Sequence, residues 1–263
     1  MTSSQIPSPD HGSLAESLAA LRSRKPLVLC ITNRVTTQRV ADTLLAAGAS
    51  PVMADHPAEI GEMLGIADAL YLNAGLHASQ QAAFEAVRAA LQATPRPSVL
   101  DPVGAGATPF RSAAIRELLS LPLSAVRGNA SEIRALAGAG EGTRGVDSAH
   151  GSDQAAEAAR QLVRERGFVV AVSGERDLIV GPGGAQGFQE SWIEGGHPWL
   201  TQITGSGCAL GALVAAFCAV LPPFGAACAA HQVFSRASEG AAQCAGPGSF
   251  SVQFLDRLSS ARA

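Results

Sequence analysis

The sequence predicts an α/β fold in which a largely parallel sheet is covered by helices on both faces. Two observations lead to this prediction. Short, unbroken apolar blocks alternate with helical segments along most of the 263 residues, as expected for buried parallel strands joined by helical crossovers. Polar residues end or follow these blocks, at the edge where open α/β sheets bind their ligands. We expect a single domain over residues 1–263, with 1–12 flexible.

The first half of the chain alternates regularly between strands and helices. We predict strands at 27–31, 50–53, 69–73 and 98–101, and helices at 13–24, 36–47, 58–66, 79–93 and 112–119. Ser13 is a suitable N-cap for the first helix, which Pro26 ends. Gly48 suits the left-handed C-cap of the second helix, and Pro57 lies where a third helix can start.

The second half continues the alternation and ends in a hairpin and apolar helices. We predict strands at 125–129 and 168–173, helices at 130–137 and 152–166, a hairpin of 178–180 with 186–193, and helices at 209–221, 226–244 and 251–260. The Gly-rich polar segment 138–151 is predicted to be a mobile loop. Because parallel strands share one carboxyl edge, five strand-end residues should meet there. They are Asn33, Asn73, Asp101, Asn129 and Ser173.

Composition excludes several classes of protein. The chain is 47% hydrophobic and 16% charged, with a net charge of −3 and no block of Lys or Arg, so we expect no nucleic-acid partner. The apolar runs are shorter than the roughly 20 residues that span a bilayer, and residues 1–11 lack the order of a secretory signal. The five cysteines form no CxxC pair, which argues against a zinc site or a disulfide framework. These features predict a reduced, cytoplasmic protein without a membrane partner.

A glycine turn, Thr204-Gly205-Ser206-Gly207-Cys208, leads directly into the apolar segment 209–221. The first turn of a helix presents free N–H groups and a positive dipole end, which bind a phosphate or a developing negative charge. Cys208 occupies the place where a phosphate-transfer enzyme can carry a carboxylate base. No GxxxxGK[ST] motif occurs in the chain, so ATP binding would not use the P-loop design.

A nucleophilic cysteine is the alternative interpretation of Cys208, because a helix N-terminus lowers the pKa of a thiol. Such an enzyme needs a histidine partner. The candidates His77, His197 and His231 have no spacing that ties them to Cys208, so this alternative is the weaker one.

Two carboxylates are expected at the same edge of the sheet. Asp101 ends a strand and precedes the glycine-rich stretch 102–108, and Glu132 follows Arg127-Gly128-Asn129. Each has a structural alternative, Asp101 as a cap in a strand-to-helix turn and Glu132 in the first turn of a helix capped by Asn129. Together they suit a hydrated Mg²⁺ beside ATP, with Arg127 as a phosphate fork.

Ser173, in Ser173-Gly174-Glu175, ends another strand. Its hydroxyl can contact a phosphate or simply close a turn, and the sequence leaves both alternatives open.

Seven segments resemble, in the same order, the motifs of the hydroxyethylthiazole kinase family. They are Cys-Ile-Thr-Asn (30–33), Gly-Ala-Ser-Pro-Val-Met (48–53), Asp-Pro-Val-Gly-Ala-Gly-Ala-Thr (101–108), Arg-Gly-Asn-Ala-Ser-Glu (127–132), Ala-Val-Ser-Gly-Glu (171–175), Gly-Ser-Gly-Cys (205–208) and Gly-Pro-Gly-Ser-Phe (246–250). The resemblance extends from about residue 13 to the end. It implies the three-layer fold of the ribokinase-like superfamily and transfer of the γ-phosphate of ATP to the primary alcohol of 4-methyl-5-(2-hydroxyethyl)thiazole, a step in thiamine salvage.

The resemblance also implies a role for each site residue. The substrate-binding residues would be Met53, Gly205 and Asn33; the ATP-binding residues Arg127, Ser173 and Asn129; the ligands of Mg²⁺, through water, Asp101 and Glu132; and the catalytic group Cys208 with Gly205 and Gly207. Gly205 to Gly207 would form the anion hole for the transferring phosphate. Cys208 replaces the Asp base that ribokinase-like enzymes usually carry there. The family forms homotrimers with substrate sites between subunits.

The chain departs from the usual family pattern at Leu29, commonly His, and at Arg34, commonly Tyr. These positions flank the substrate strand and leave the identity of the alcohol open. The alternatives are a kinase for the pyrimidine half of thiamine, an ADP- or ATP-dependent dehydratase of hydrated nicotinamide cofactors, and an inactive binding protein of vitamin metabolism.

Overall fold

An eight-stranded mixed sheet forms the centre of the molecule in the computed structural model, which describes residues 13–75, 80–138, 151–183 and 187–261. The strand order is β2-β1-β3-β4-β5-β6-β7-β8, parallel from β2 through β6 and antiparallel at β7 and β8. The strands are β1 Leu27–Ile31, β2 Ser50–Val52, β3 Ala69–Asn73, β4 Ser98–Asp101, β5 Ala125–Asn129, β6 Val169–Ser173, β7 Asp177–Pro182 and β8 Phe188–Ile193. The predicted fold class is confirmed.

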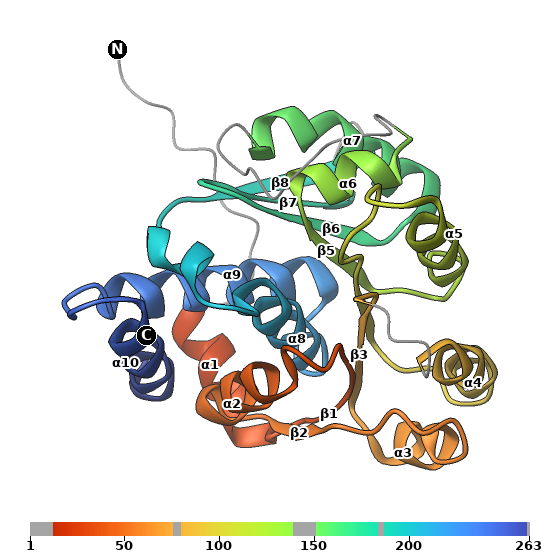
Figure 1. The fold of residues 1–263 in the computed structure, drawn as a ribbon, viewed down its shortest axis with the longest axis horizontal. Helices are drawn as coiled ribbons and strands as arrows, with labels where there is room; N and C mark the ends of the chain where they lie inside the picture. Colours follow the sequence, from red (N-terminus) through yellow and green to blue (C-terminus); the bar gives the residue numbers. More distant parts are fainter. Residues whose placement is uncertain (1–12, 76–79, 139–150, 184–186, 262–263) are drawn as a thin grey trace.

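Helices cover both faces of this sheet (Figure 1). One face carries α1 Leu14–Arg24, α2 Thr37–Ala47, α8 Ser206–Cys218, α9 Pro223–Gly240 and α10 Pro247–Ser260. The other carries α3 Ile60–Ile66, α4 Gln80–Ala93, α5 Pro109–Leu118, α6 Ala130–Leu136 and α7 Gly151–Arg166. In the described part of the chain, no helix is long and apolar enough to cross a membrane.

The two-residue period of the strands divides their side chains between two separate cores. In β3, Leu70 and Leu72 pack under α3–α7, whereas Tyr71 packs under α8. The face under α8 is lined by small strand residues, such as Ala125 and Ala171. This allows the Ala-rich α8 to approach the sheet closely. A Cβ at Gly211 of α8 would lie 2.9 Å from Cε2 of Tyr71, so only glycine fits at this crossing.

The strand order reverses direction between β1 and β3. From β1 the chain goes first to β2 on one side and then to β3 on the other. Such a switch point opens a crevice at the carboxyl ends of the strands. Asn33, two residues beyond β1, and Asn73, the last residue of β3, lie at this point.

Local signals set most element boundaries, and some predictions were wrong by a turn. Ser13 caps α1 in a capping box with Glu16, and Gly48 ends α2 with φ 104°, both as expected. The helix predicted at 112–119 starts earlier, at Pro109, because Thr108 caps it. The helix predicted at 226–244 runs from Pro223 to Gly240 instead.

Further segments also differ from the predicted elements. α3 begins at Ile60 rather than residue 58, α8 spans Ser206–Cys218 rather than 209–221, and α10 begins at Pro247 rather than residue 251. A 3₁₀ helix, η1 (Pro198–Gln202), was not predicted. The predictions for residues 1–12, for most of 138–151 and for His77 lie outside the described residues.

Candidate functional site

The strand-end residues named from the sequence lie at one edge of the sheet. In register, Asn73 pairs with Asp101 across β3 and β4, and Asn129 pairs with Ser173 across β5 and β6. The first turn of α8 covers this edge, since a Cβ added at Gly207 would lie 2.6 Å from Nη1 of Arg127. Charged, amide and hydroxyl groups from both halves of the chain therefore converge here.

Glu132 makes the helix-capping hydrogen bonds that the sequence allowed as the alternative to binding Mg²⁺. The Asn129 side chain accepts from the Glu132 N–H at 2.9 Å, and Glu132 Oε2 accepts from the Asn129 N–H at 2.9 Å, which is a capping box for α6. Glu132 Oε1 accepts from the Gly104 N–H at 3.0 Å. The carboxylate thus joins α6 to the glycine stretch after β4. Burial raises its pKa, partly offset by these backbone hydrogen bonds.

Asp101 is fully buried and incompletely hydrogen-bonded. Its Oδ2 accepts from the Tyr71 hydroxyl at 3.0 Å and lies 3.7 Å from Nη1 of Arg127, while Oδ1 has no partner among the described residues. Asp101 does not cap α5, because Thr108 does. Burial raises the pKa of Asp101 to about 7, with Glu132 adding to the shift and Arg127 opposing it.

Arg127 links this carboxylate to the end of β6. Its guanidinium donates to the Ser173 hydroxyl and is almost completely buried, with Nε unpartnered in the described structure. Burial opposes its charge, but Asp101 and Glu132 raise its pKa overall. A fixed cation beside a helix start is an arrangement that binds phosphate.

The glycine turn adopts the conformation that its composition favours. Gly205 is the N-cap of α8 with φ 83°, and a Cβ there would lie 2.8 Å from Cγ2 of Thr36. Both the left-handed backbone and the close approach require glycine. The first hydrogen bond of the helix runs from the Ala209 N–H to the Gly205 carbonyl at 2.9 Å. The N–H groups of residues 206–208 therefore precede this ladder and lie in the turn of α8 that approaches Arg127.

Cys208 is buried at the third position of α8, and its sulfur lies 3.7 Å from Nδ2 of Asn33. Burial and the nearby Asp101 charge raise its pKa, the reverse of what an activated nucleophile requires. The two described histidine candidates are engaged elsewhere. His231 Nδ1 lies 2.6 Å from Asp177 Oδ2, and His197 Nδ1 accepts from the Trp199 N–H at 3.2 Å. The nucleophilic-cysteine alternative has no support from this geometry.

Tyr71 is a site residue that the sequence analysis missed. It lies inside an apolar strand segment, where a tyrosine is normally interpreted as a core residue, and it is fully buried. Its hydroxyl donates to Asp101 and accepts from Asn73 Nδ2 at 2.8 Å. The available signal was spacing, since Tyr71, the only tyrosine of the chain, shares a face of β3 with Asn73.

The remaining residues lie on the β1–β2 side of the edge. Met53 follows β2 and is half-buried against the α8 face. Arg34 is exposed, whereas Leu29 is fully buried in the core under α3–α7, on the opposite face from Tyr71. Leu29 therefore contributes to strand packing and does not line the cluster.

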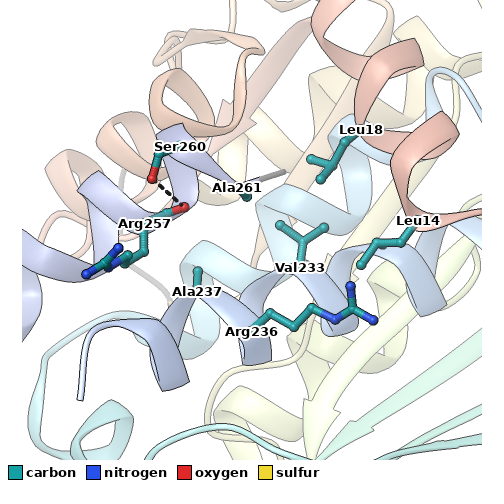
Figure 2. Close-up of a pocket in the computed structure, with 8 residues that line it drawn as sticks. All are labelled: Leu14, Leu18, Val233, Arg236, Ala237, Arg257, Ser260 and Ala261. Carbon is teal, nitrogen blue, oxygen red and sulfur yellow. Dashed lines mark hydrogen bonds between the residues drawn. The ribbon is translucent and has the colours of Figure 1, made fainter. Parts of the chain in front are cut away.

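A cavity opens beside the glycine turn. It has a volume of about 450 Å³, and Thr204, Arg39, Val35 and Pro247 are among its lining residues. A second cavity, of about 200 Å³, lies between α1, α9 and α10, with Leu14, Val233 and Arg257 among its lining residues (Figure 2). Thr204, which immediately precedes Gly205 in the chain, lines the first cavity, whereas none of the strand-end residues lines either cavity.

The donor set fits a hydrated Mg²⁺ better than a metal held by a full protein cage. In the described segments, no three His, Cys, Asp or Glu side chains are grouped to hold a metal. Mg²⁺ typically keeps several waters and uses one or two carboxylates with substrate phosphates. The unpartnered Oδ1 of Asp101 is free for such a water, and Glu132 lies close enough to perturb the pKa of Asp101.

The fold and the strand-edge cluster define a ribokinase-like α/β protein. Pyridoxal kinase of Bacillus subtilis, solved as an ADP complex, shares this fold with a TM-score of 0.59 at 20% identity, over 81% of this chain and 91% of that one. At that identity the likeness concerns the fold alone.

A more specific assignment comes from the family model and from closer relatives. The model of the hydroxyethylthiazole kinase family matches residues 18–263, and the chain belongs to this family. Hydroxyethylthiazole kinase of Kineococcus radiotolerans is 46% identical over 96% of this chain and 90% of its own length. That of Clavibacter sepedonicus is 48% identical over 93% and 88%. A solved structure of a hydroxyethylthiazole kinase protein from Pyrococcus horikoshii OT3 is 35% identical, with a TM-score of 0.84 over 95% of this chain and 94% of that one. The family predicted from the seven motifs is confirmed.

Proposed function

We propose that the protein transfers the γ-phosphoryl group of ATP to the primary alcohol of 4-methyl-5-(2-hydroxyethyl)thiazole, a step in thiamine salvage. One observation carries the proposal. The start of α8, Arg127 and the buried Asp101 meet at a single strand edge, where they place positive charge and free N–H groups beside a partly unpaired carboxylate. Relatives that align with nearly the whole chain bear the name of this kinase.

Phosphoryl transfer requires mainly positioning and charge neutralisation, because its transition state is loose. Arg127 would bind the ATP phosphates with Ser173 and Asn129. The N–H groups of Gly205 to Gly207 would hold the transferring group as an anion hole. Hydrated Mg²⁺, when bound at Asp101 and Glu132, neutralises phosphate charge.

The acceptor alcohol would lie on the other side of the edge. Met53 and Gly205 would contact the thiazole, with Asn33 close by. Cys208 would face the hydroxyl from the place where a carboxylate base is usual. A thiol whose pKa is raised by burial is a weak base at neutral pH, so the chemical step should be slow for a kinase.

The proposal includes a cytoplasmic homotrimer of one-domain subunits, with acceptor sites at the subunit interfaces. In its support, the side chain of Val35, which lines the cavity with Thr204, is 79% exposed, and that of Val252, next to the lining residue Ser251, is 61% exposed. Large apolar side chains exposed beside a cavity suit a surface that a second subunit covers. Light scattering after gel filtration tests this; a mass near three times 26.7 kDa is expected, and a monomer would contradict it.

A coupled assay of ADP release tests the activity itself. ADP should form from ATP only when the thiazole alcohol is present, with one phosphorylated thiazole per ADP. ADP release with a hydrated nicotinamide nucleotide, and none with the thiazole, would instead indicate the dehydratase alternative. Calorimetric binding of the thiazole without turnover would indicate a binding protein.

A further inference from the structure

A continuous chain of hydrogen bonds joins the buried carboxylate to the cysteine of the glycine turn. The Tyr71 hydroxyl donates to Asp101 Oδ2 at 3.0 Å, and Asn73 Nδ2 donates to the Tyr71 oxygen at 2.8 Å. Asn33 Nδ2 donates to Asn73 Oδ1 at 3.1 Å and lies 3.7 Å from the Cys208 sulfur. The chain crosses from the proposed phosphate side to the proposed acceptor side.

The direction of this chain is fixed by a backbone donor. Asn73 Oδ1 accepts from the Gly75 N–H at 2.9 Å, so the NH₂ group of Asn73 must face the Tyr71 oxygen. The Tyr71 hydroxyl has a single hydrogen, and because its oxygen accepts from Asn73, that hydrogen is donated to Asp101 Oδ2.

The orientation of Asn33 follows from both sides. Its NH₂ group must face Asn73 Oδ1, and its own oxygen accepts from the N–H groups of Val35 at 3.1 Å and Thr36 at 3.2 Å. Its second N–H then points toward Cys208. Reversing this amide would place oxygen against oxygen at one end and N–H against N–H at the other, which is costly for a partly buried group.

Tyr71 connects Asp101 to Asn73 in this series of hydrogen bonds. It is the only tyrosine in the sequence, it is fully buried, and α8 lies so close that a Cβ at Gly211 would meet its ring at 2.9 Å. This packing and the two hydrogen bonds hold its hydroxyl between Asp101 and Asn73.

We propose that Tyr71 is a positioning residue whose hydroxyl, held by Asp101, anchors the NH₂ group of Asn73 and thereby holds the Asn33 amide in place. Asn33 thereby presents an N–H donor to Cys208 and to the oxygen of an acceptor alcohol. The proposal for the alcohol rests on the proposed function, whereas the hydrogen-bond chain itself does not. Tyr71 need not touch substrate to act in this way.

The asparagine content of the chain gives a direct test. The sequence contains three asparagines, Asn33, Asn73 and Asn129, so selective side-chain ¹⁵N labelling yields three NH₂ signal pairs. Asn129 caps α6 away from the chain of hydrogen bonds and is an internal control. Tyr71→Phe should shift the pairs of Asn73 and Asn33 and leave that of Asn129 in place.

Thr43→Val is the matched control, because it also deletes one buried hydroxyl, from α2, that has no partner among the described groups. It should move none of the three pairs. An Asn33 pair that stays in place when Tyr71→Phe moves Asn73 would overturn the proposal. If Tyr71→Phe does not fold, Asn73→Leu breaks the same chain and must move the Asn33 pair.

Kinetics separate this role from a structural one. For Tyr71→Phe we expect kcat for the thiazole alcohol to fall by about 10-fold or more, as for loss of supporting hydrogen bonds around a functional carboxylate, with the KM for ATP within about 2-fold. An equal loss in Thr43→Val, or a change in the KM for ATP alone, would contradict the proposal. An enzyme with no thiazole turnover in its unmodified form would instead refute the proposed function, and the NMR result would still decide the role of Tyr71.

Discussion

The two halves of the strand edge are built from different chemistry. The half formed by β4, β5 and β6 carries ionisable groups, Asp101, Arg127 and Glu132, which are buried against one another. The half formed by β1 and β3 carries neutral amides, Asn33 and Asn73, which are hydrogen-bonded to each other. Fixed charges hold one another in place and suit an anionic substrate such as ATP. Neutral amides must be oriented by hydrogen bonds, and they suit a small uncharged alcohol.

The largest loss of activity should come from adding a side chain at Gly207, where the start of α8 approaches Arg127. In Gly207→Val the first carbon of the side chain would lie 2.6 Å from Nη1 of the buried Arg127. The guanidinium must move or the start of α8 must shift, so we expect kcat to fall by at least about 10²–10³-fold. Gly65→Ala in α3, where a Cβ meets nothing within 4 Å, is the control and should retain full activity. Near-normal kcat in Gly207→Val would mean that the two halves are not in contact during catalysis.

Removing a charge from the β4–β6 half of the strand edge should weaken the binding of ATP and leave that of the alcohol nearly unchanged. Arg127→Ala should raise the KM for ATP by about 10-fold or more, because a contact with a charged group contributes about 1.5–3 kcal/mol. The KM for the alcohol should change much less. Steady-state kinetics with each substrate varied in turn measures the split, and an unchanged KM for ATP would remove Arg127 from the phosphate site.

Replacing the cysteine should show how little base catalysis this site provides. Burial raises the pKa of the Cys208 thiol, so the thiol stays protonated at neutral pH and cannot accept the proton of the alcohol. Cys208→Asp supplies a carboxylate base at this place, so kcat should stay equal or rise. Single-turnover rates with saturating substrates measure the chemical step. An inactive Cys208→Asp beside a fully active Cys208→Ser would show that base catalysis at this position is not the limiting factor.

The smallest expected effect is on how the stability of the folded protein depends on pH. The pKa of Asp101 is raised from 3.8 to about 7, so between these values the folded protein binds a proton that the unfolded chain has released. The free energy of unfolding of the metal-free protein should therefore decrease as pH rises through this window. Asp101→Asn should weaken this dependence and raise Tm by a few degrees at pH 8, while abolishing the response to Mg²⁺. Thermal unfolding from pH 4 to pH 8 is the test, and a Tm of Asp101→Asn below that of the unmodified protein at pH 8 would contradict it.

The sequence was sufficient to predict the sheet and the edge at which its polar residues gather. Apolar blocks such as 69–73 and 98–101 became strands with the predicted ends, because a buried parallel strand needs an uninterrupted apolar run. Helix boundaries in Ala-, Gly- and Pro-rich segments, such as the end of α9 and η1, were less predictable because periodicity is weak there.

The site was harder to predict than the fold because several residues have two uses. Glu132 and Asn129 form a capping box and are also our proposed ligands, so the structural and functional interpretations are compatible. The link through Tyr71 depends on which face of β3 meets α8 and on the missing side chain of Gly211. The sequence shows that Tyr71 and Asn73 share a face of β3, but only the packed structure shows that this face meets α8 at Gly211.

The most direct test of the account is the ratio of turnover on two alcohols. Initial rates with ATP and Mg²⁺ are measured for the thiazole alcohol and for the hydroxymethylpyrimidine of the other half of thiamine. We expect kcat/KM for the thiazole to exceed that for the pyrimidine by at least about 10²-fold, the discrimination available from a pocket of fitted shape and hydrogen bonds. Equal or higher kcat/KM for the pyrimidine alcohol would contradict it.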